Sequence, residues 1–559
     1  MKNKKTILGL LFLLVLSGLM MLRQLLTPGY FTTTVSDAYA YSSWASQFVE
    51  ALKEGVIYPR WIPFSFWGYG SPAFILYPPL AFYFAAFFNL FTDSIITAMN
   101  ITKFISLFIS ATGMYFLIKE FYSEKIALLT ASFLIVFPLV ISNYYLFGGF
   151  ASVISFMWFS PILLFASRYF EKRQYRNLIY AGACYGALVL THLINAYMFT
   201  FVLLAFLIYR VFVSGRPKDI IAIPIIFGVG FLISSAYILP LIFEKQFFNL
   251  KVFIGEGGGF HYGHFFILPK LTEKLPPDHV WPVYYYSTVF QLFLLLTLLF
   301  LFLYQTGQLR YEERMNNVRV MNHFFLGVVF ISIFFTFGIS SFLWETIPFI
   351  KYIQFPTRWF NFTGYSLIFL SAITFSAPET IYKSRKGYFI ICILFLTCFL
   401  LSAKYIKAAP YFPEEELIPV KSVDLTREHL PAWVDVNKID QNDMGKEKTT
   451  IIEGEGVAAV VLWQYAERVI VVNATTPLTL RIRTFYFPGW KAYLDGINIS
   501  IQTENGTGAM LIDISEGDHK LELKFVDTPV RYYGKLISLL SLVVLGYLIL
   551  TNRSVKNIW

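Results

Sequence analysis

Long apolar runs recur along most of the chain and alternate with short polar segments. Each run is long enough, or nearly so, for a helix that crosses about 30 Å of hydrocarbon. The runs cover residues 7–26, 101–118, 126–141, 150–167, 178–209 (enough for two spans), 220–243, 288–304, 324–343, 359–376, 388–402 and 536–550. The pattern predicts a polytopic α-helical membrane protein with about twelve spans.

Lysine and arginine residues cluster in alternate loops, and such loops stay in the cytoplasm. The basic clusters lie near residues 119–125, 168–176, 210–218, 310–319, 383–386 and 553–556. This distribution predicts a multi-pass protein of the plasma membrane with both termini cytoplasmic. The outer segments are then residues 27–100, 143–149, 244–286, 343–358 and 404–534.

Two apolar segments need a separate interpretation. Residues 73–91 could span the membrane but contain the pair Pro78-Pro79, and a full crossing would place every later basic loop outside. We therefore expect a broken or interfacial helix within the first outer loop. The N-terminal run could be a cleavable signal peptide, but Arg23 and Gln24 stand where cleavage needs small residues, which favours an uncleaved span.

The last outer segment has a different pattern. From Val457 onward apolar and polar residues alternate, as in Leu478–Arg483 and Lys520–Phe525, which is typical of half-buried strands. Turn pairs such as Asp495-Gly496 separate the strands. We predict an extracytoplasmic β-sandwich-like domain over residues 404–534, followed by a final transmembrane helix and cytoplasmic tail over residues 535–559.

Composition supports the membrane assignment. Hydrophobic residues make up 56% of the chain and charged residues only 14%, which excludes soluble globular and disordered classes. The net charge of +10 is spread over the loop clusters that set orientation, so we expect no nucleic-acid partner. The three cysteines all lie inside apolar runs and predict neither a disulfide framework nor a cysteine metal site.

The first outer loop holds the main catalytic candidate. Asp37 follows the first span, and an amphipathic stretch and an aromatic segment rich in proline and glycine come after it. An acid in this position can serve a reaction at the outer membrane surface. The alternative is that Asp37 caps the N-terminus of the following helix.

Several motifs resemble integral membrane glycosyltransferases of the GT-C fold. The likeness is carried by Asp37-Ala38-Tyr39, Tyr58-Pro59-Arg60-Trp61, Gly68-Tyr69-Gly70-Ser71-Pro72, Tyr77-Pro78-Pro79-Leu80 and Gln354-Phe355-Pro356-Thr357-Arg358. These strings are most similar to the group of pyruvoyl-tetrahydropterin-synthase-related membrane proteins. Residues 487–496 resemble the outer β-domain of bacterial membrane glycosyltransferases that decorate lipoteichoic acid.

The resemblance implies a GT-C-like transmembrane catalytic domain over residues 1–403 and a polyprenyl-phosphate-linked sugar donor used at the outer face. The acceptor would be a cell-envelope glycan, lipid or protein, and Asp37 would be the base that deprotonates it. Donor-phosphate contacts are predicted for Arg358, Arg60, Lys53 and Lys351. The substrate-pocket candidates are Tyr39, Tyr58, Trp61, Tyr69, Tyr77, His192, Asn195 and Gln354.

Alternatives remain for several of these residues. Arg358 could instead extend towards the interface as a snorkelling side chain. His192 and Asn195 could be a buried hydrogen-bonding pair between helices. The glycine-rich segment with Glu256, His261 and His264 predicts a mobile lid within the outer loop 244–286, with zinc binding as the rival interpretation.

No cofactor is predicted. The second outer segment, residues 142–152, contains no carboxylate of the kind that holds a divalent metal in oligosaccharyltransferase-type relatives, so we expect metal independence. Two other function classes stay open. One is a transporter or flippase of lipid-linked sugars, and the other is a non-catalytic cell-envelope scaffold.

Overall fold

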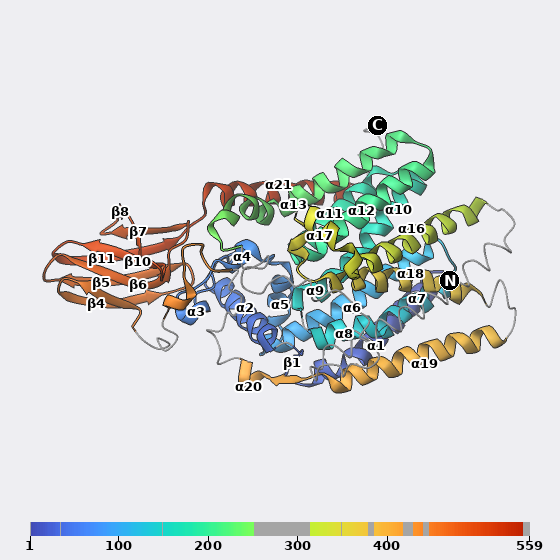
Figure 1. Cartoon of the computed structure of the whole chain (residues 1–559), viewed down its shortest axis with the longest axis horizontal. Helices are drawn as coiled ribbons and strands as arrows, with labels where there is room; N and C mark the ends of the chain where they lie inside the picture. Colours follow the sequence, from blue (N-terminus) through green and yellow to red (C-terminus); the bar gives the residue numbers. More distant parts are fainter. Residues whose placement is uncertain are drawn as a thin grey trace.

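The protein is elongated, with a helical bundle and a β-domain that lie end to end (Figure 1). The computed structural model describes residues 2–33, 35–147, 149–250, 313–347, 349–377, 385–417, 429–439 and 447–551. The span predicted at residues 288–304 and the predicted lid residues Glu256, His261 and His264 lie outside these ranges.

Helices form the larger part. Their bounds are α1 Lys2–Leu26, α2 Val35–Lys53, α3 Ser65–Gly68, α4 Ala73–Leu76, α5 Leu80–Asn89, α6 Ile95–Lys119, α7 Glu124–Val136, α8 Pro138–Ser142, α9 Phe150–Ser155, α10 Phe159–Lys172, α11 Tyr175–Thr191, α12 Leu193–Ser214, α13 Ala222–Glu244, α16 Glu313–Thr336, α17 Ser341–Thr346, α18 Phe360–Ala377, α19 Arg385–Ala408, α20 Glu414–Leu417 and α21 Pro529–Thr551. In the described part of the chain, 8 helices are long and apolar enough to cross a membrane. The polytopic helical architecture is therefore confirmed, and the count of about twelve spans stays a prediction.

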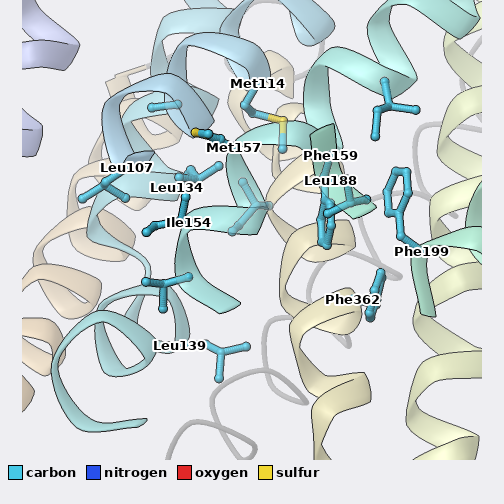
Figure 2. Packing of buried hydrophobic residues seen from close by; sticks show 14 of the residues in the cluster. Leu107, Met114, Leu134, Leu139, Ile154, Met157, Phe159, Leu188, Phe199 and Phe362 are labelled. Atoms are coloured by element: carbon cyan, nitrogen blue, oxygen red, sulfur yellow. The ribbon is translucent and has the colours of Figure 1, made fainter. Parts of the chain in front are cut away.

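Aromatic and aliphatic side chains fill the centre of the bundle (Figure 2). Phe159 of α10 stacks on Phe199 of α12 at 4.5 Å and on Phe362 of α18 at 5.4 Å, measured between ring centroids. Glycines bring α11 and α13 into close contact, since a Cβ on Gly182 would lie 2.7 Å from Val229. Such close approach is a usual means of holding helices together where lipid removes the hydrophobic driving force.

The first outer loop contains the predicted broken helix. Pro78 and Pro79 separate α4 from α5, and α5 has only 10 residues. A helix of that length extends about 15 Å, half of the hydrocarbon thickness, so α5 alone is too short to span. The expectation of a broken segment at residues 73–91 is confirmed.

The C-terminal domain is a sandwich of two antiparallel sheets, with strand orders β3-β6-β10-β9 and β4-β5-β11-β7-β8. Its strands are β3 Thr449–Glu453, β4 Gly456–Trp463, β5 Glu467–Ala474, β6 Leu478–Phe485, β7 Trp490–Leu494, β8 Ile497–Ile499, β9 Gln502–Thr503, β10 Ala509–Ile514 and β11 Gly517–Phe525. The alternation predicted for β6 and β11 is confirmed, because Leu480, Ile482, Leu521 and Leu523 are fully buried between the sheets. A separate short pair, β1 Gly29–Phe31 with β2 Tyr411–Pro413, joins the start of the first outer loop to the chain after α19.

The turn between β7 and β8 shows how local chemistry sets this register. Asp495 and Gly496 both have positive φ, 52° and 84°, as a two-residue hairpin turn requires. The Asp495 carboxylate also binds His519 Nδ1 at 2.7 Å, and His519 Nε2 lies 3.1 Å from Ser515 Oγ. The hydrogen bond to Asp495 raises the pKa of His519, so this link between two turns is strongest when the imidazole is protonated.

A buried ion pair joins the β-domain to the bundle. Arg531, in the first turns of α21, donates to Glu244 at the end of α13 at 2.9 Å, and both side chains are almost fully buried. Arg531 Nη2 also donates to the Pro488 carbonyl of the β-domain at 2.7 Å. One guanidinium therefore holds two helices and the sandwich at a single point.

Replacing Arg531 with methionine should destabilise the protein strongly. Glu244 would be left as a buried unpaired charge, which typically lowers the free energy of unfolding by about 3–5 kcal/mol. Thermal unfolding in detergent should show a large fall in Tm. The matched control is Lys535→Met on the same helix, because Lys535 pairs with Asp527 while 44% of its side chain is exposed. An equal fall in Tm for the two variants would contradict the prediction.

Candidate functional site

A polar cluster lies where α11 gives way to α12. His192, between the two helices, accepts from the Asn195 backbone N–H through Nδ1 at 3.1 Å and so caps α12. The Asn195 amide in turn donates to Ser152 Oγ at 3.1 Å and to Ser155 Oγ at 2.8 Å, both on α9. His192 and Asn195 thus form a hydrogen-bonding pair at the start of α12, and the Asn195 amide connects it to α9. Their place in a substrate pocket stays a prediction.

Arg358, on another element, acts electrostatically on His192 of this cluster. It lies in the short 3-10 helix Pro356–Trp359, and its guanidinium interacts electrostatically with His192. Arg358 Nη1 donates to the Ile353 carbonyl at 2.7 Å, and the guanidinium lies 5.1 Å from the centroid of Phe355. The structure thus links Arg358 electrostatically to the pair of His192 and Asn195.

The backbone before Arg358 is strained. Gln354 has φ 64° and ψ −54°, a region that costs a non-glycine residue about 1–3 kcal/mol. It joins the 3-10 helix Ile350–Ile353 to the one that carries Arg358. Such strain persists where the surroundings over-determine the conformation, and it is concentrated at functional sites. Gln354 therefore remains a pocket candidate.

A small cavity lies between α6, α8 and α18, and it was not predicted from the sequence. Asn361, three residues after Arg358, accepts from the Asn143 amide at 2.9 Å, and both asparagines line the cavity together with Tyr144 and Tyr365. Asn143 begins a π-helical turn, Asn143–Phe147, a rare element that is frequent at functional sites. The only sequence signal was the polar start of the second outer segment.

Asp37 lies in the first turn of α2, two residues after the helix begins at Val35. This position is inside the helix rather than before it, where an N-cap residue stands. Tyr41, one turn further along α2, contacts the ring of Phe150 at the start of α9 at 6.5 Å between centroids. The helix that carries Asp37 therefore contacts α9, whose Ser152 and Ser155 accept hydrogen bonds from Asn195 of α12.

Arg60, another predicted phosphate ligand, contacts α13 and Asp527, which lies just before α21. Pro240 has no N–H, so the Ala236 carbonyl in α13 lacks its helical partner, and Arg60 Nη2 donates to it at 3.2 Å. Arg60 also lies 3.7 Å from Asp527 and 3.7 Å above the Tyr58 ring. Arg60 and Tyr58 thus stand at the junction between α13 and α21.

The remaining predicted residues of the first outer loop have structural contacts. Trp61 and Tyr69 are almost fully buried in the β-domain core, where Tyr69 stacks on Phe485 at 4.9 Å. Tyr77 donates to the Tyr41 hydroxyl at 3.2 Å, and Tyr39 contacts Phe412. This burial makes Trp61 and Tyr69 residues that dock the loop on the β-domain rather than pocket-lining residues.

Lys53 and Lys351 are both exposed, at the end of α2 and in the 3-10 helix Ile350–Ile353. Exposed lysines hold a phosphate more weakly than a partly buried arginine, because water screens their charge. Within the described ranges, no group of three or more His, Cys, Asp or Glu side chains could hold a metal ion.

Comparison with known proteins identifies one family. A family described as 6-pyruvoyl-tetrahydropterin synthase related domain, a membrane protein, matches residues 74–407, more than half of the chain. A sequence search of curated proteins finds no match.

Solved structures show a partial likeness. The apo oligosaccharyltransferase of Archaeoglobus fulgidus is 13% identical with a TM-score of 0.45, over 73% of this chain and 57% of that one. The same archaeal enzyme in complex with an inhibitory peptide and a dolichol-phosphate is 14% identical with a TM-score of 0.42, over 74% and 57%. ArnT from Cupriavidus metallidurans is 11% identical with a TM-score of 0.28, over 68% and 81%. The chain therefore spans less than two thirds of the length of the oligosaccharyltransferase.

Proposed function

The chain belongs to the family of 6-pyruvoyl-tetrahydropterin synthase related membrane proteins, and from this premise we propose that it is a GT-C-type glycosyltransferase. It moves a sugar from a polyprenyl-phosphate-linked donor to a cell-envelope acceptor at the outer membrane face. One observation supports the proposal: the Arg358 guanidinium acts electrostatically on His192, which caps the helix of Asn195. Asn195 donates to α9, and the Asp37-bearing helix contacts α9 through the rings of Tyr41 and Phe150.

The chemistry assigns a role to each group. Asp37 takes the proton of the acceptor hydroxyl as its oxygen attacks the anomeric carbon of the donor sugar. The bond between that carbon and the phosphate oxygen breaks, and the lipid phosphate leaves as an anion. Arg358 stabilises this anion, because a fixed cation in a partly buried site needs no reorganisation when the charge develops. His192 and Asn195 form the wall of the donor pocket next to Arg358.

The β-domain serves acceptor binding in this proposal. Its core encloses Trp61 and Tyr69 of the first outer loop, so it sits directly on the loop that begins with α2. An acceptor bound on the β-domain would therefore approach the helix that carries Asp37.

A direct assay tests the proposal. The full chain, reconstituted in liposomes with a radiolabelled polyprenyl-phosphate-linked sugar and an envelope extract, should transfer label to an acceptor and release lipid phosphate in equal amounts. Movement of labelled lipid between leaflets without release of lipid phosphate would instead support the flippase alternative. Binding of the donor with neither reaction would support the scaffold.

Metal removal should leave the transfer unchanged. Residues 142–147 and 149–152 supply no carboxylate, and divalent cations need several oxygen ligands with charge among them. We expect the transfer rate to change less than about twofold in excess EDTA, since the Arg358 cation takes the role of a metal at the leaving group. Loss of activity in EDTA that magnesium or manganese restores would contradict this prediction.

A further inference from the structure

A lysine is completely buried inside the helical bundle. Lys103 lies in the third turn of α6, and its side chain is 0% exposed. Its ammonium stands 3.8 Å from the centroid of the Tyr30 ring in β1. Among the described residues, Lys103 Nζ has no hydrogen-bond partner. The sequence signal was a single basic residue near the start of an apolar run.

This position is unfavourable for a charge. An ammonium in a membrane-spanning helix is costly to desolvate, and the face of an aromatic ring recovers only part of that free energy. Two buried amide oxygens of the same region, Asn100 Oδ1 and Gln24 Oε1, also lack partners in the described structure. A methionine would fill the same space without these penalties. A lysine at this position therefore costs stability relative to an apolar residue of similar size.

The surrounding contacts show what Lys103 holds. Asn100, one turn earlier on α6, donates to the Gly29 carbonyl of β1 at 3.0 Å. The Lys103 side chain contacts the ring of Tyr30, the next residue of β1. Beyond β1, the Thr33 hydroxyl donates to the Leu146 carbonyl at 2.7 Å. Two residues later α2 begins, and Asp37 lies in its first turn.

We propose that Lys103 is a positioning residue for catalysis: its buried ammonium fixes β1 through the Tyr30 ring and so sets the place of the α2 turn that carries Asp37. The inference rests on the proposed function. A base must be held in a near-attack geometry, and a displacement of about 1 Å at a distance from the chemistry can lower the rate about a hundredfold. The cation–ring contact supplies directional hold on a strand of only three residues.

The test replaces Lys103 with methionine in the full chain. We expect kcat for sugar transfer to fall about 10- to 100-fold with an unchanged KM for the donor, while Tm stays the same or rises. The matched control is Lys119→Met at the other end of α6, where the lysine pairs with Glu124 and is one third exposed; this variant should keep its kcat. A fall of Tm in parallel with kcat would show a merely structural role and would overturn the proposal.

A second variant covers the case in which methionine prevents folding. Lys103→Gln keeps a polar end that can donate to the unpaired amide oxygens, and it should lose kcat to the same degree. Full kcat in this variant would overturn the proposal, since the charge would be dispensable. Asp37→Asn in parallel separates the two hypotheses: if Asp37→Asn transfers sugar normally, the proposed function fails whatever Lys103 does.

Discussion

Asp37→Asn should lower kcat for sugar transfer by about 100- to 10,000-fold, the usual contribution of a positioned general base. Asparagine keeps the size of the side chain and its position in the first turn of α2 but cannot take the acceptor proton. Donor binding should persist, because the proposed phosphate contact is made by Arg358 and not by Asp37. The loss should therefore appear in kcat rather than in the donor KM.

The same reconstituted transfer assay measures this loss. Asp93→Asn is the matched control, because it makes the same chemical change at an exposed carboxylate of the same outer loop. It should leave the rate within about twofold of the wild type, as surface substitutions away from special features usually do. Transfer at the wild-type rate by Asp37→Asn would refute the role of Asp37 as base.

Arg358→Gln should lower kcat by about 100- to 1,000-fold, the range found when one preorganised donor to a developing anion is removed. Glutamine can still donate a hydrogen bond, but it brings no charge to the departing lipid phosphate. The hydrogen bonds of His192 and Asn195 should stay intact, because the Asn195 backbone N–H donates to His192 and the Asn195 amide donates to Ser152 and Ser155. The variant should therefore fold normally.

Product inhibition distinguishes phosphate binding from snorkelling. If Arg358 holds the lipid phosphate, added polyprenyl phosphate should inhibit the Arg358→Gln variant much more weakly than the wild type. Arg216→Gln, at an exposed arginine between α12 and α13, provides the same substitution away from the site and should change neither rate nor inhibition. Unaltered inhibition in Arg358→Gln would show that Arg358 serves only the membrane interface.

The periodicity of apolar and polar residues along the chain was sufficient to predict the architecture. Apolar runs become helices in a membrane because every backbone group must be satisfied within the segment, and alternating runs become strands because one face of a sheet is buried. The break at Pro78-Pro79 and the hairpin at Asp495-Gly496 could also be predicted from the sequence, because proline and positive-φ turns constrain the backbone locally.

The contacts between residues far apart in the chain could not be predicted from this periodicity. Trp61 and Tyr69 have the composition of a binding loop, yet they enter the β-domain core, whose strands lie about 400 residues later in the sequence. Arg60 has the same local sequence context as a phosphate ligand, but the carbonyl freed by Pro240 and the carboxylate of Asp527 engage it. Which acceptor an arginine meets depends on how the helices cross.

By itself, then, the sequence determined a polytopic helical membrane protein with a C-terminal β-sandwich, and it singled out Asp37, Arg358 and the pair of His192 and Asn195. Only the tertiary structure decided that the charge of Arg358 acts on His192, that Asn143 and Asn361 line a cavity, and that Lys103 is buried against Tyr30 of β1. The reason is physical: local propensity acts over a few residues, whereas these contacts join helices that are far apart in the chain and meet only through packing.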